Sequence, residues 1–232
     1  MWNIIGQDHL LNGLESSFRQ KRQSHAYLLC GPPHVGKMAL AINLCQAINC
    51  LEGSGEPCGS CDQCTRIAEG NHSDIRILSP GQGTEGRAAR IMIGINELKE
   101  SLRRVHLNPY EGSTSVVIIN GAEFMSDECA NALLKTLEEP TSSTYIFLLS
   151  HLPSSLPATI RSRCQKLIMP TPSNIEAVDW LKQQITDQED PQSLAIASGN
   201  CPLLALDLAR SGGLDKQQQF LQKLTHITSR KT

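Results

Sequence analysis

The sequence predicts an α/β fold in which a doubly wound, parallel five-stranded sheet is followed by a small all-helical domain. Three observations lead to this prediction. Short aliphatic runs alternate with stretches whose apolar residues recur at helical spacing. One run leads through a glycine loop directly into such a stretch, and after Pro170 only helical patterns remain. We therefore expect one domain over residues 1–169 and a second over residues 170–232.

The five expected strands are short and rich in aliphatic residues, as buried parallel strands are. They cover residues 26–30, 74–78, 115–119, 144–149 and 166–169. Four helices are expected in the same domain, within residues 8–20, 38–48, 95–107 and 126–139. Because strands and helices alternate, the connections should be crossovers that produce a parallel sheet.

The C-terminal stretch contains start and stop signals of helices. Ser173 and Glu176 have the spacing of a capping box. Pro191 and Pro202 are each suited to the first turn of a further helix, and Gly199 and Gly212 to the ends of these helices. A fourth helix could begin at Asp215.

The bulk composition limits the possible partners. The formal net charge of the 232 residues is −2, so no overall field attracts the chain to DNA. No segment has the pattern of a signal peptide or the apolar length of a membrane span. We therefore expect a cytoplasmic protein with no membrane partner, in which the nine cysteines are reduced or bind metal.

The glycine loop has the spacing of a nucleotide-binding P-loop. Residues 31–37 read G-x-x-x-x-G-K between an expected strand and an expected helix, so backbone N–H groups could surround a phosphate. Gly31, Gly36 and Lys37 are the candidate nucleotide-binding residues. The alternative is a simple Gly/Pro turn between a strand and a helix.

Two features indicate that this loop has lost its chemistry. Met38 stands where a Ser or Thr hydroxyl would hold Mg²⁺, and a thioether is a poor ligand for that cation. Asn120 and Gly121 follow the 115–119 strand, where an ATPase carries an acidic pair. Mg²⁺ is therefore not expected, binding of ATP or ADP is doubtful, and the sequence predicts no intrinsic ATPase activity.

Four cysteines lie in a polar insert at about residues 50–64. Cys50, Cys58, Cys61 and Cys64 could present four thiolates to one tetrahedral ion, which predicts a closed, structural zinc site. The insert contains mainly turn formers and little to bury, so metal binding would supply its order. Free cysteines on a loop, or a redox pair, are the alternatives.

Two further positions have both a functional and an ordinary interpretation. Ser150 follows the 144–149 strand and is a possible sensor of a γ-phosphate, or only a residue that ends the strand. Arg163 precedes the last strand. It could act as an arginine finger on a neighbour's phosphates, or simply lie on a solvated surface. The residues alone favour the ordinary interpretation of Arg163.

Several motifs together resemble a known family. They are IIGQ at 4–7, HAYLLCGPPHVGK at 25–37, the four-cysteine insert, ANALLKTLEEP at 130–140 and ATIRSRC at 158–164. Over nearly its whole length the chain resembles the AAA+ subunits of the bacterial DNA polymerase III clamp loader, the gamma/tau/delta-prime group. The losses at Met38 and Asn120 favour the delta-prime type, because gamma-type subunits keep an intact nucleotide site.

The resemblance implies roles for single residues and for the two domains. Arg163 would be a trans arginine finger that completes an adjacent subunit's ATP site, and the four cysteines would bind zinc. Residues 170–232 would form a helical lid, in which Pro202 or Leu203 stands where ATP-using relatives carry an arginine. The family's third, helical collar domain would be absent, because the sequence ends at Thr232.

Three functions follow as hypotheses. The first is a non-hydrolysing stator that works with gamma/tau and delta subunits while the DNA polymerase III holoenzyme loads its sliding clamp onto primed DNA. The second is an active ATPase of gamma/tau type. The third is a zinc-bearing DNA-binding module without a partner ATPase.

Overall fold

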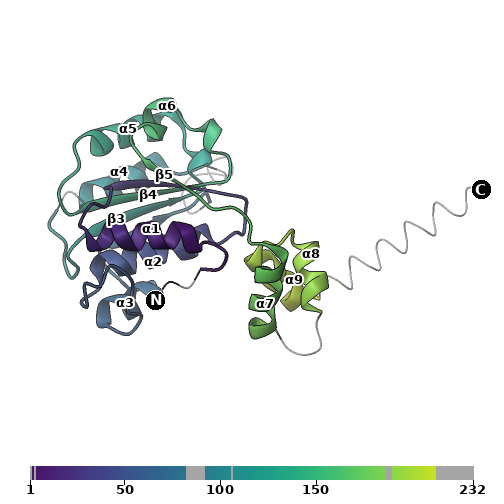
Figure 1. Cartoon of the computed structure of the whole chain (residues 1–232). Coiled ribbons are helices and arrows are strands. Elements are labelled where there is room, and N and C mark those ends of the chain that lie inside the picture. Colours follow the sequence, from purple (N-terminus) through teal and green to yellow (C-terminus); the bar gives the residue numbers. More distant parts are fainter. Residues whose placement is uncertain (1, 3, 82–91, 106, 186–189, 213–232) are drawn as a thin grey trace, which may run out of the picture. The chain divides into compact units, whose positions relative to one another are not determined.

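A computed structural model of the chain describes residues 2, 4–81, 92–105, 107–185 and 190–212 (Figure 1). The chain divides into two compact units. One comprises Met1–Pro32 and Lys37–Met169, and the other Pro33–Gly36 and Pro170–Thr232. In the part of the chain that is described, no helix is both long and apolar enough to cross a membrane.

The first unit contains a five-stranded parallel sheet with the strand order β2-β3-β4-β1-β5. Its strands are β1 (Ala26–Cys30), β2 (Ile75–Leu78), β3 (Ser115–Asn120), β4 (Thr144–Ser150) and β5 (Gln165–Ile168). The register pairs Ala26 with Ile146 and Tyr27 with Gln165, so β1 lies between β4 and β5. The predicted sheet and its five strands are confirmed, with boundaries that differ by at most one residue.

Helices cover both faces of this sheet, with α1 and α2 on one side and α4 and α5 on the other (Figure 1). The helices of the first unit are α1 (Asp8–Arg19), α2 (Lys37–Asn49), α3 (Asp62–Ala68), α4 (Ile95–Val105), α5 (Asp127–Glu138) and α6 (Ala158–Arg161). Two short 3₁₀ helices, η2 (Ala122–Phe124) and η3 (Pro153–Ser155), follow β3 and β4. The doubly wound arrangement is therefore as predicted.

Alternate residues of the central strands face the two helical layers, as the period of a strand requires. Leu28, Val117 and Ile146 belong to one buried cluster that also contains Leu133 of α5. Tyr27 and Phe147 point to the opposite face and contact edge to face, with ring centroids 5.7 Å apart. Both faces are thus buried, which is why these strands appear in the sequence as continuous aliphatic runs.

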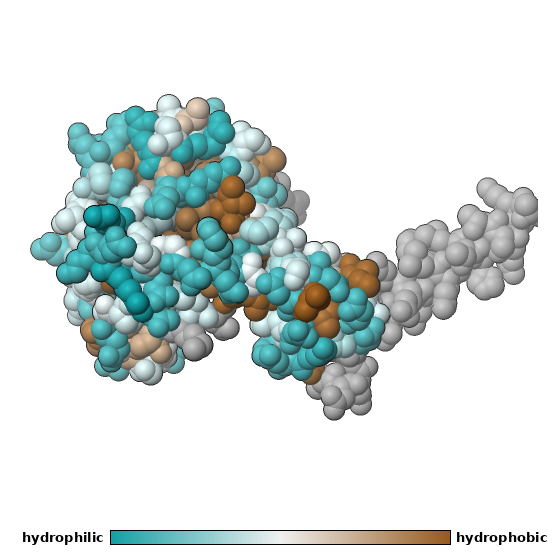
Figure 2. Space-filling model, in the orientation of Figure 1, coloured by the Kyte–Doolittle hydropathy of each residue, from teal (hydrophilic) through white to brown (hydrophobic). Residues whose placement is uncertain are grey.

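The edge strand of the sheet is more exposed to solvent than the central strands. β5 is an edge strand and exposes 62% of Ile168. Figure 2 shows a mostly hydrophilic face with a hydrophobic patch close to the position that β5 has in Figure 1.

The second unit contains α7 (Asn174–Gln184), α8 (Pro191–Ala197) and α9 (Pro202–Ser211). The predicted capping box is confirmed, since the Ser173 hydroxyl accepts from the Glu176 N–H and the Glu176 carboxylate accepts from the Ser173 N–H. Gly212 adopts φ +59° and ends α9. Leu181, Leu194 and Ala205 belong to the small hydrophobic core of this second unit. The fourth helix expected from Asp215 lies outside the described residues.

Candidate functional site

The glycine loop begins where β1 ends. Because the strands are parallel, the ends of β1, β3 and β4 lie at the same edge of the sheet. There, the Gly31 N–H donates to the Ser150 carbonyl at 3.3 Å and the Gly121 N–H to the Leu149 carbonyl at 3.0 Å. The structure therefore brings together Gly31 at the start of the loop, Ser150 and Asn120, at the place where open α/β sheets bind ligands.

Lys37 is the first residue of α2 and turns back onto its own loop. Its Nζ donates to the carbonyl oxygens of Gly31 at 2.8 Å and Pro32 at 2.7 Å. Gly36 has φ +103°, a conformation that L side chains rarely adopt, which explains why this position needs glycine. The ammonium group is thus bound by loop carbonyls in this arrangement.

The groups after β3 do not form an acidic pair. Asn120 donates from Nδ2 to the Ser79 hydroxyl at 3.4 Å. Gly121 has φ +76°, and a Cβ atom there would lie 2.9 Å from Cδ2 of Phe124. The Glu123 carboxylate belongs to η2, and its Oε1 lies within hydrogen-bonding distance of Nδ1 of His151. The nearest carboxylate in sequence is therefore already engaged by an imidazole.

Ser150 is buried at the end of β4. Its hydroxyl accepts from the backbone N–H of Leu152 at 3.1 Å, a contact typical of a residue that ends a strand. A hydroxyl can still donate its own hydrogen to a second group. The geometry is compatible with both interpretations of this residue.

Arg163 lies at the opposite end of the sheet, where the parallel strands begin. It stands two residues before β5, whose first residue Gln165 pairs with Tyr27 near the start of β1. Strands rise about 3.3 Å per residue, so the length of β1 puts this end of the sheet about 15 Å from the glycine loop. Nη2 of Arg163 lies 2.6 Å from Oε1 of Glu138, the last residue of α5. Arg163 is therefore not brought together with Gly31, Lys37 or Ser150.

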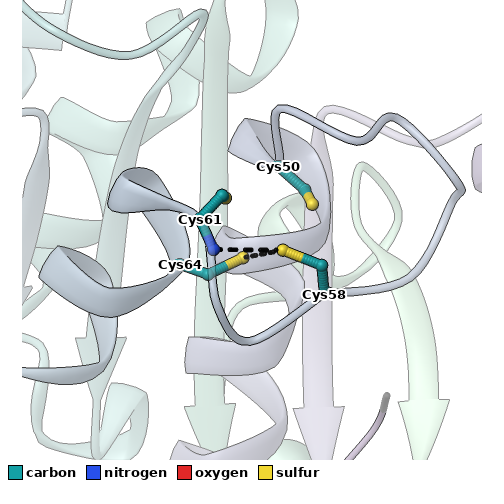
Figure 3. Close-up of side chains that lie close together, drawn as sticks. All are labelled: Cys50, Cys58, Cys61 and Cys64. Carbon is teal, nitrogen blue, oxygen red and sulfur yellow. Dashed lines mark hydrogen bonds between the residues drawn. The ribbon is translucent and has the colours of Figure 1, made fainter.

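The four cysteines of the insert converge as predicted (Figure 3). Their Sγ atoms all lie within 4.8 Å of one another, and those of Cys58 and Cys64 are 3.9 Å apart. Cys50 directly follows α2, while Cys61 caps α3 and Cys64 lies in its first turn. Two helix ends and one loop thus supply the thiols.

This donor set fits a metal ion. Zn–S bonds of about 2.3 Å in a tetrahedron put sulfur atoms about 3.8 Å apart, close to the spacing of Cys58 and Cys64. Backbone N–H groups of Ser60 and Cys61 lower the pKa of the Cys58 thiol to about 6. Burial raises the pKa of the Cys64 thiol to about 12. A cation bound by all four would favour the thiolate at Cys64 and offset that cost of burial.

The prediction that the insert is a loop with little to bury is wrong at its C-terminal end. Residues 62–68 form α3, in which Cys64 and Ile67 are buried. The cysteine spacing by itself predicts only a set of ligands, whereas Asp62 in a first turn and the apolar Ile67 are signals of a helix. α3 therefore gives the insert a small core of its own.

Polar side chains that the sequence analysis missed connect the insert to α2 and to the loop around Glu111. Gln46 of α2 is buried and donates from Nε2 to the Cys64 carbonyl at 2.8 Å. Gln63 of α3 contacts Nε2 of His72 at 2.5 Å and donates to the Glu111 carbonyl at 3.1 Å. The insert is therefore fixed from two sides.

A buried carboxylate organises the loop that receives these contacts. Asp74 accepts from the backbone N–H groups of Tyr110, Glu111 and Gly112 at 2.7–2.9 Å. Burial alone would raise its pKa, but these three hydrogen bonds lower it below its usual value. The Asn49 side chain accepts in the same way from the N–H groups of Ser113 and Thr114.

Comparison with known proteins identifies the family. Residues 6–173 match the sequence model of a family described as DNA polymerase III, delta subunit. The chain is 34% identical over 204 residues to DNA polymerase III subunit delta′ of Pseudomonas aeruginosa, covering 87% of this chain and 60% of that protein. It is 31% identical over 215 residues to subunit delta′ of Escherichia coli, covering 92% and 63%.

A second group of relatives is also similar. The tau subunit of DNA polymerase III from Bacillus subtilis is 30% identical over 213 residues, covering 91% of this chain and 35% of that protein. The chain spans 60–63% of the length of the first three delta′ relatives. The resemblance stated from the motifs is therefore confirmed.

Solved structures support the fold. A DNA polymerase III gamma-subunit-related protein of Thermotoga maritima gives a TM-score of 0.56 at 21% identity, covering 90% of this chain and 62% of that one. A RuvB variant of the same organism gives 0.57 at 17% identity, covering 89% and 61%. These two likenesses confirm the predicted α/β fold. With the family match over residues 6–173, these results show that the chain belongs to the DNA polymerase III delta-subunit family.

Proposed function

We propose that this chain is a delta-prime-like subunit of the bacterial DNA polymerase III clamp loader that does not hydrolyse ATP. In this proposal residues 1–169 are its AAA+ module and residues 170–232 its helical lid. Its partners are the gamma/tau and delta subunits, and the assembly loads the sliding clamp onto primed DNA in the cytoplasm. Family membership and the delta′ relatives support this proposal.

The position of Arg163 supports it most directly. The guanidinium of Arg163 is partly exposed, and its backbone lies at the end of the sheet opposite the chain's own glycine loop, about 15 Å from it by the rise of β1. It is too distant to act on a nucleotide in that loop. A phosphate that meets Arg163 should therefore belong to another subunit, where a fixed positive charge would stabilise the transferring phosphoryl group.

The chain's own loop offers little for hydrolysis. Lys37 is bound by loop carbonyls, Met38 has no oxygen ligand, and Asn120 contacts Ser79 rather than presenting a carboxylate. Hydrolysis requires a hard-cation site and a group that orients water. Gly31, Gly36 and Lys37 are then a remnant of a nucleotide site, and Ser150 is at most a sensor of a bound phosphate.

We also propose that Cys50, Cys58, Cys61 and Cys64 bind one zinc ion. Four thiolates leave no open coordination position, so the ion would stabilise the insert and take no part in a reaction. The four cysteines would hold the ion, while Gln46 and Gln63 connect the site to the remainder of the unit.

Two measurements of ATP hydrolysis test the proposal. The purified chain and its Lys37→Ala variant should show the same negligible turnover. In a complex reconstituted with gamma and delta subunits, Arg163→Ala should lower turnover at least about 100-fold, given the usual contribution of an arginine finger. Arg161→Ala, two residues away, is the matched control and should behave as wild type. Wild-type turnover with Arg163→Ala would refute the finger.

A hydrolysing gamma/tau-type subunit is the second candidate, favoured by the 30% identity to a tau subunit. It requires that magnesium is held despite Met38 and Asn120. Turnover by the chain alone that disappears in Lys37→Ala would support this candidate and overturn the stator proposal.

A further inference from the structure

Two oxygen atoms from neighbouring elements hold the guanidinium of Arg163. Nη2 lies 2.6 Å from Oε1 of Glu138, and Nη1 donates to the carbonyl oxygen of Thr159 at 2.9 Å. The side chains of Arg163 and Glu138 are 36% and 50% exposed. A guanidinium has five N–H donors, so these two contacts leave donors for a second anion.

The backbones that carry this pair are fixed. Glu138 follows Leu137 and Arg163 precedes Cys164, and both neighbours are buried in one core cluster. Nε2 of His25 also contacts the Leu137 carbonyl at 3.1 Å. The pair therefore joins two anchored segments rather than two mobile ones, so its geometry can be reproducible from molecule to molecule.

The place of Glu138 is not explained by the stability of its helix. It is the last residue of α5, where the helix dipole is negative and a carboxylate is unfavourable. Lys135 in the same turn is the favourable charge. An exposed ion pair contributes little to folding, so the contact with Arg163 does not make Glu138 important for stability either.

We propose that Glu138 is a positioning residue that holds Arg163 in the conformation in which it meets a neighbouring subunit's phosphates. This inference rests on the proposed role of Arg163 as a trans finger. A long arginine side chain loses conformational entropy when it is fixed. The contacts with Glu138 and Thr159 fix it before the phosphate arrives, so less is lost at the reacting site.

The chain alone provides the first test, which does not depend on any partner. The ¹⁵N relaxation of the Arg163 guanidinium should report restricted motion in wild type and clearly greater motion in Glu138→Ala, which keeps only the contact with the Thr159 carbonyl. Glu138→Gln keeps one acceptor oxygen and should be intermediate. Glu139→Ala, the adjacent carboxylate, is the matched control and should equal wild type. Equal restriction in wild type and Glu138→Ala would overturn the proposal.

The melting temperature separates positioning from a structural role. Because Glu138 opposes the dipole of α5, Glu138→Ala should melt at the wild-type temperature or slightly above it. A clear fall in the melting temperature would mean that Glu138 acts by supporting the fold, and would count against positioning.

The reconstituted complex with gamma and delta subunits provides the second test. Glu138→Ala should lower the kcat of ATP turnover about 10-fold with KM within about twofold, since a misplaced finger affects the transition state. Glu138→Gln should lose less, and Glu139→Ala nothing. If Arg163→Ala lowers turnover at least about 100-fold while Glu138→Ala turns over at the wild-type rate, the finger stands and the positioning proposal fails. If Arg163→Ala changes nothing, the finger itself fails.

Discussion

The side-chain amide of Gln46 donates to the backbone carbonyl of Cys64 at 2.8 Å, so α2 directly supports the cysteine insert. Because α2 also begins at the glycine loop, one helix connects the two features that the sequence singles out. Gln46 is buried, so the loss of its amide would leave the Cys64 carbonyl without this donor.

Gln46→Leu should therefore lower the free energy of unfolding by about 0.5–1.5 kcal/mol, the usual net contribution of one hydrogen bond, because the Cys64 carbonyl within α3 can still accept from the backbone of that helix. Urea unfolding followed by circular dichroism measures this change. The exposed Gln183→Leu in α7 is the control and should change stability by less than about 0.5 kcal/mol. A Gln46→Leu chain as stable as wild type would contradict this contribution.

Metal analysis tests the cysteine cluster. After dialysis the chain should carry one zinc ion, and Cys61→Ser should lose it, because a tetrahedral site needs all four ligands. Loss of the ion should unfold the insert and α3, which a protease would cut near residues 50–64.

Cys201→Ser is the matched control, because Cys201 caps α9 in the other unit and serine is a favourable N-cap. It should keep its zinc and its stability. Folded, metal-free wild-type protein would refute the zinc site.

The Asp74 carboxylate predicts a pH dependence of stability. Three backbone N–H groups hold its folded-state pKa below the unfolded value of about 3.9. The stabilisation is therefore fully present above that value and is lost as pH falls from about 4 through the lower, folded-state pKa. Asp74→Asn removes this contribution and should cost about 1–3 kcal/mol at pH 7.

The difference in unfolding free energy between wild type and Asp74→Asn should consequently shrink as pH falls below about 4. The comparison with one variant removes the contributions of the other carboxylates. Asp179→Asn is the control, since it breaks only an exposed pair with Lys182 and should change stability little at pH 7. A difference that stays constant down to pH 2 would contradict the assignment.

Local patterns in the sequence predicted most of the fold. Aliphatic runs such as the one in Ser115–Asn120 are buried on both faces. The capping box that fixes the start of α7 needs only the four residues from Ser173 to Glu176. Cys58, Cys61 and Cys64 follow one another closely, so their convergence could also be predicted. These features depend on neighbours in the sequence.

Contacts between distant segments could not be predicted. Asp74 and Gly112 are 38 positions apart, and neither has a local signal for the other. The pair of Glu138 and Arg163 likewise depends on how α5 and α6 pack. α3 was missed for a different reason, because cysteines that suit a metal site can also lie on a helix.

Two glycines give opposite predictions for the same substitution. Gly121 has φ +76°, and a Cβ atom there would lie 2.9 Å from Phe124 and 3.3 Å from Pro80. Gly121→Ala should therefore destabilise the chain by about 1–3 kcal/mol. Gly13 lies within α1 with nothing within 4 Å of an added Cβ, so Gly13→Ala should stabilise it by about 0.5–1 kcal/mol.

Thermal unfolding of both variants measures these changes, and Gly13→Ala serves as the control for a methyl group added without strain. The same strain would oppose any larger side chain at position 121, where an ATPase of this fold would carry a carboxylate. Gly121→Glu should therefore cost at least as much stability as Gly121→Ala and should not create hydrolysis. A Gly121→Ala chain as stable as wild type would show that the backbone after β3 can leave the left-handed conformation, and an acidic residue there would then be sterically possible.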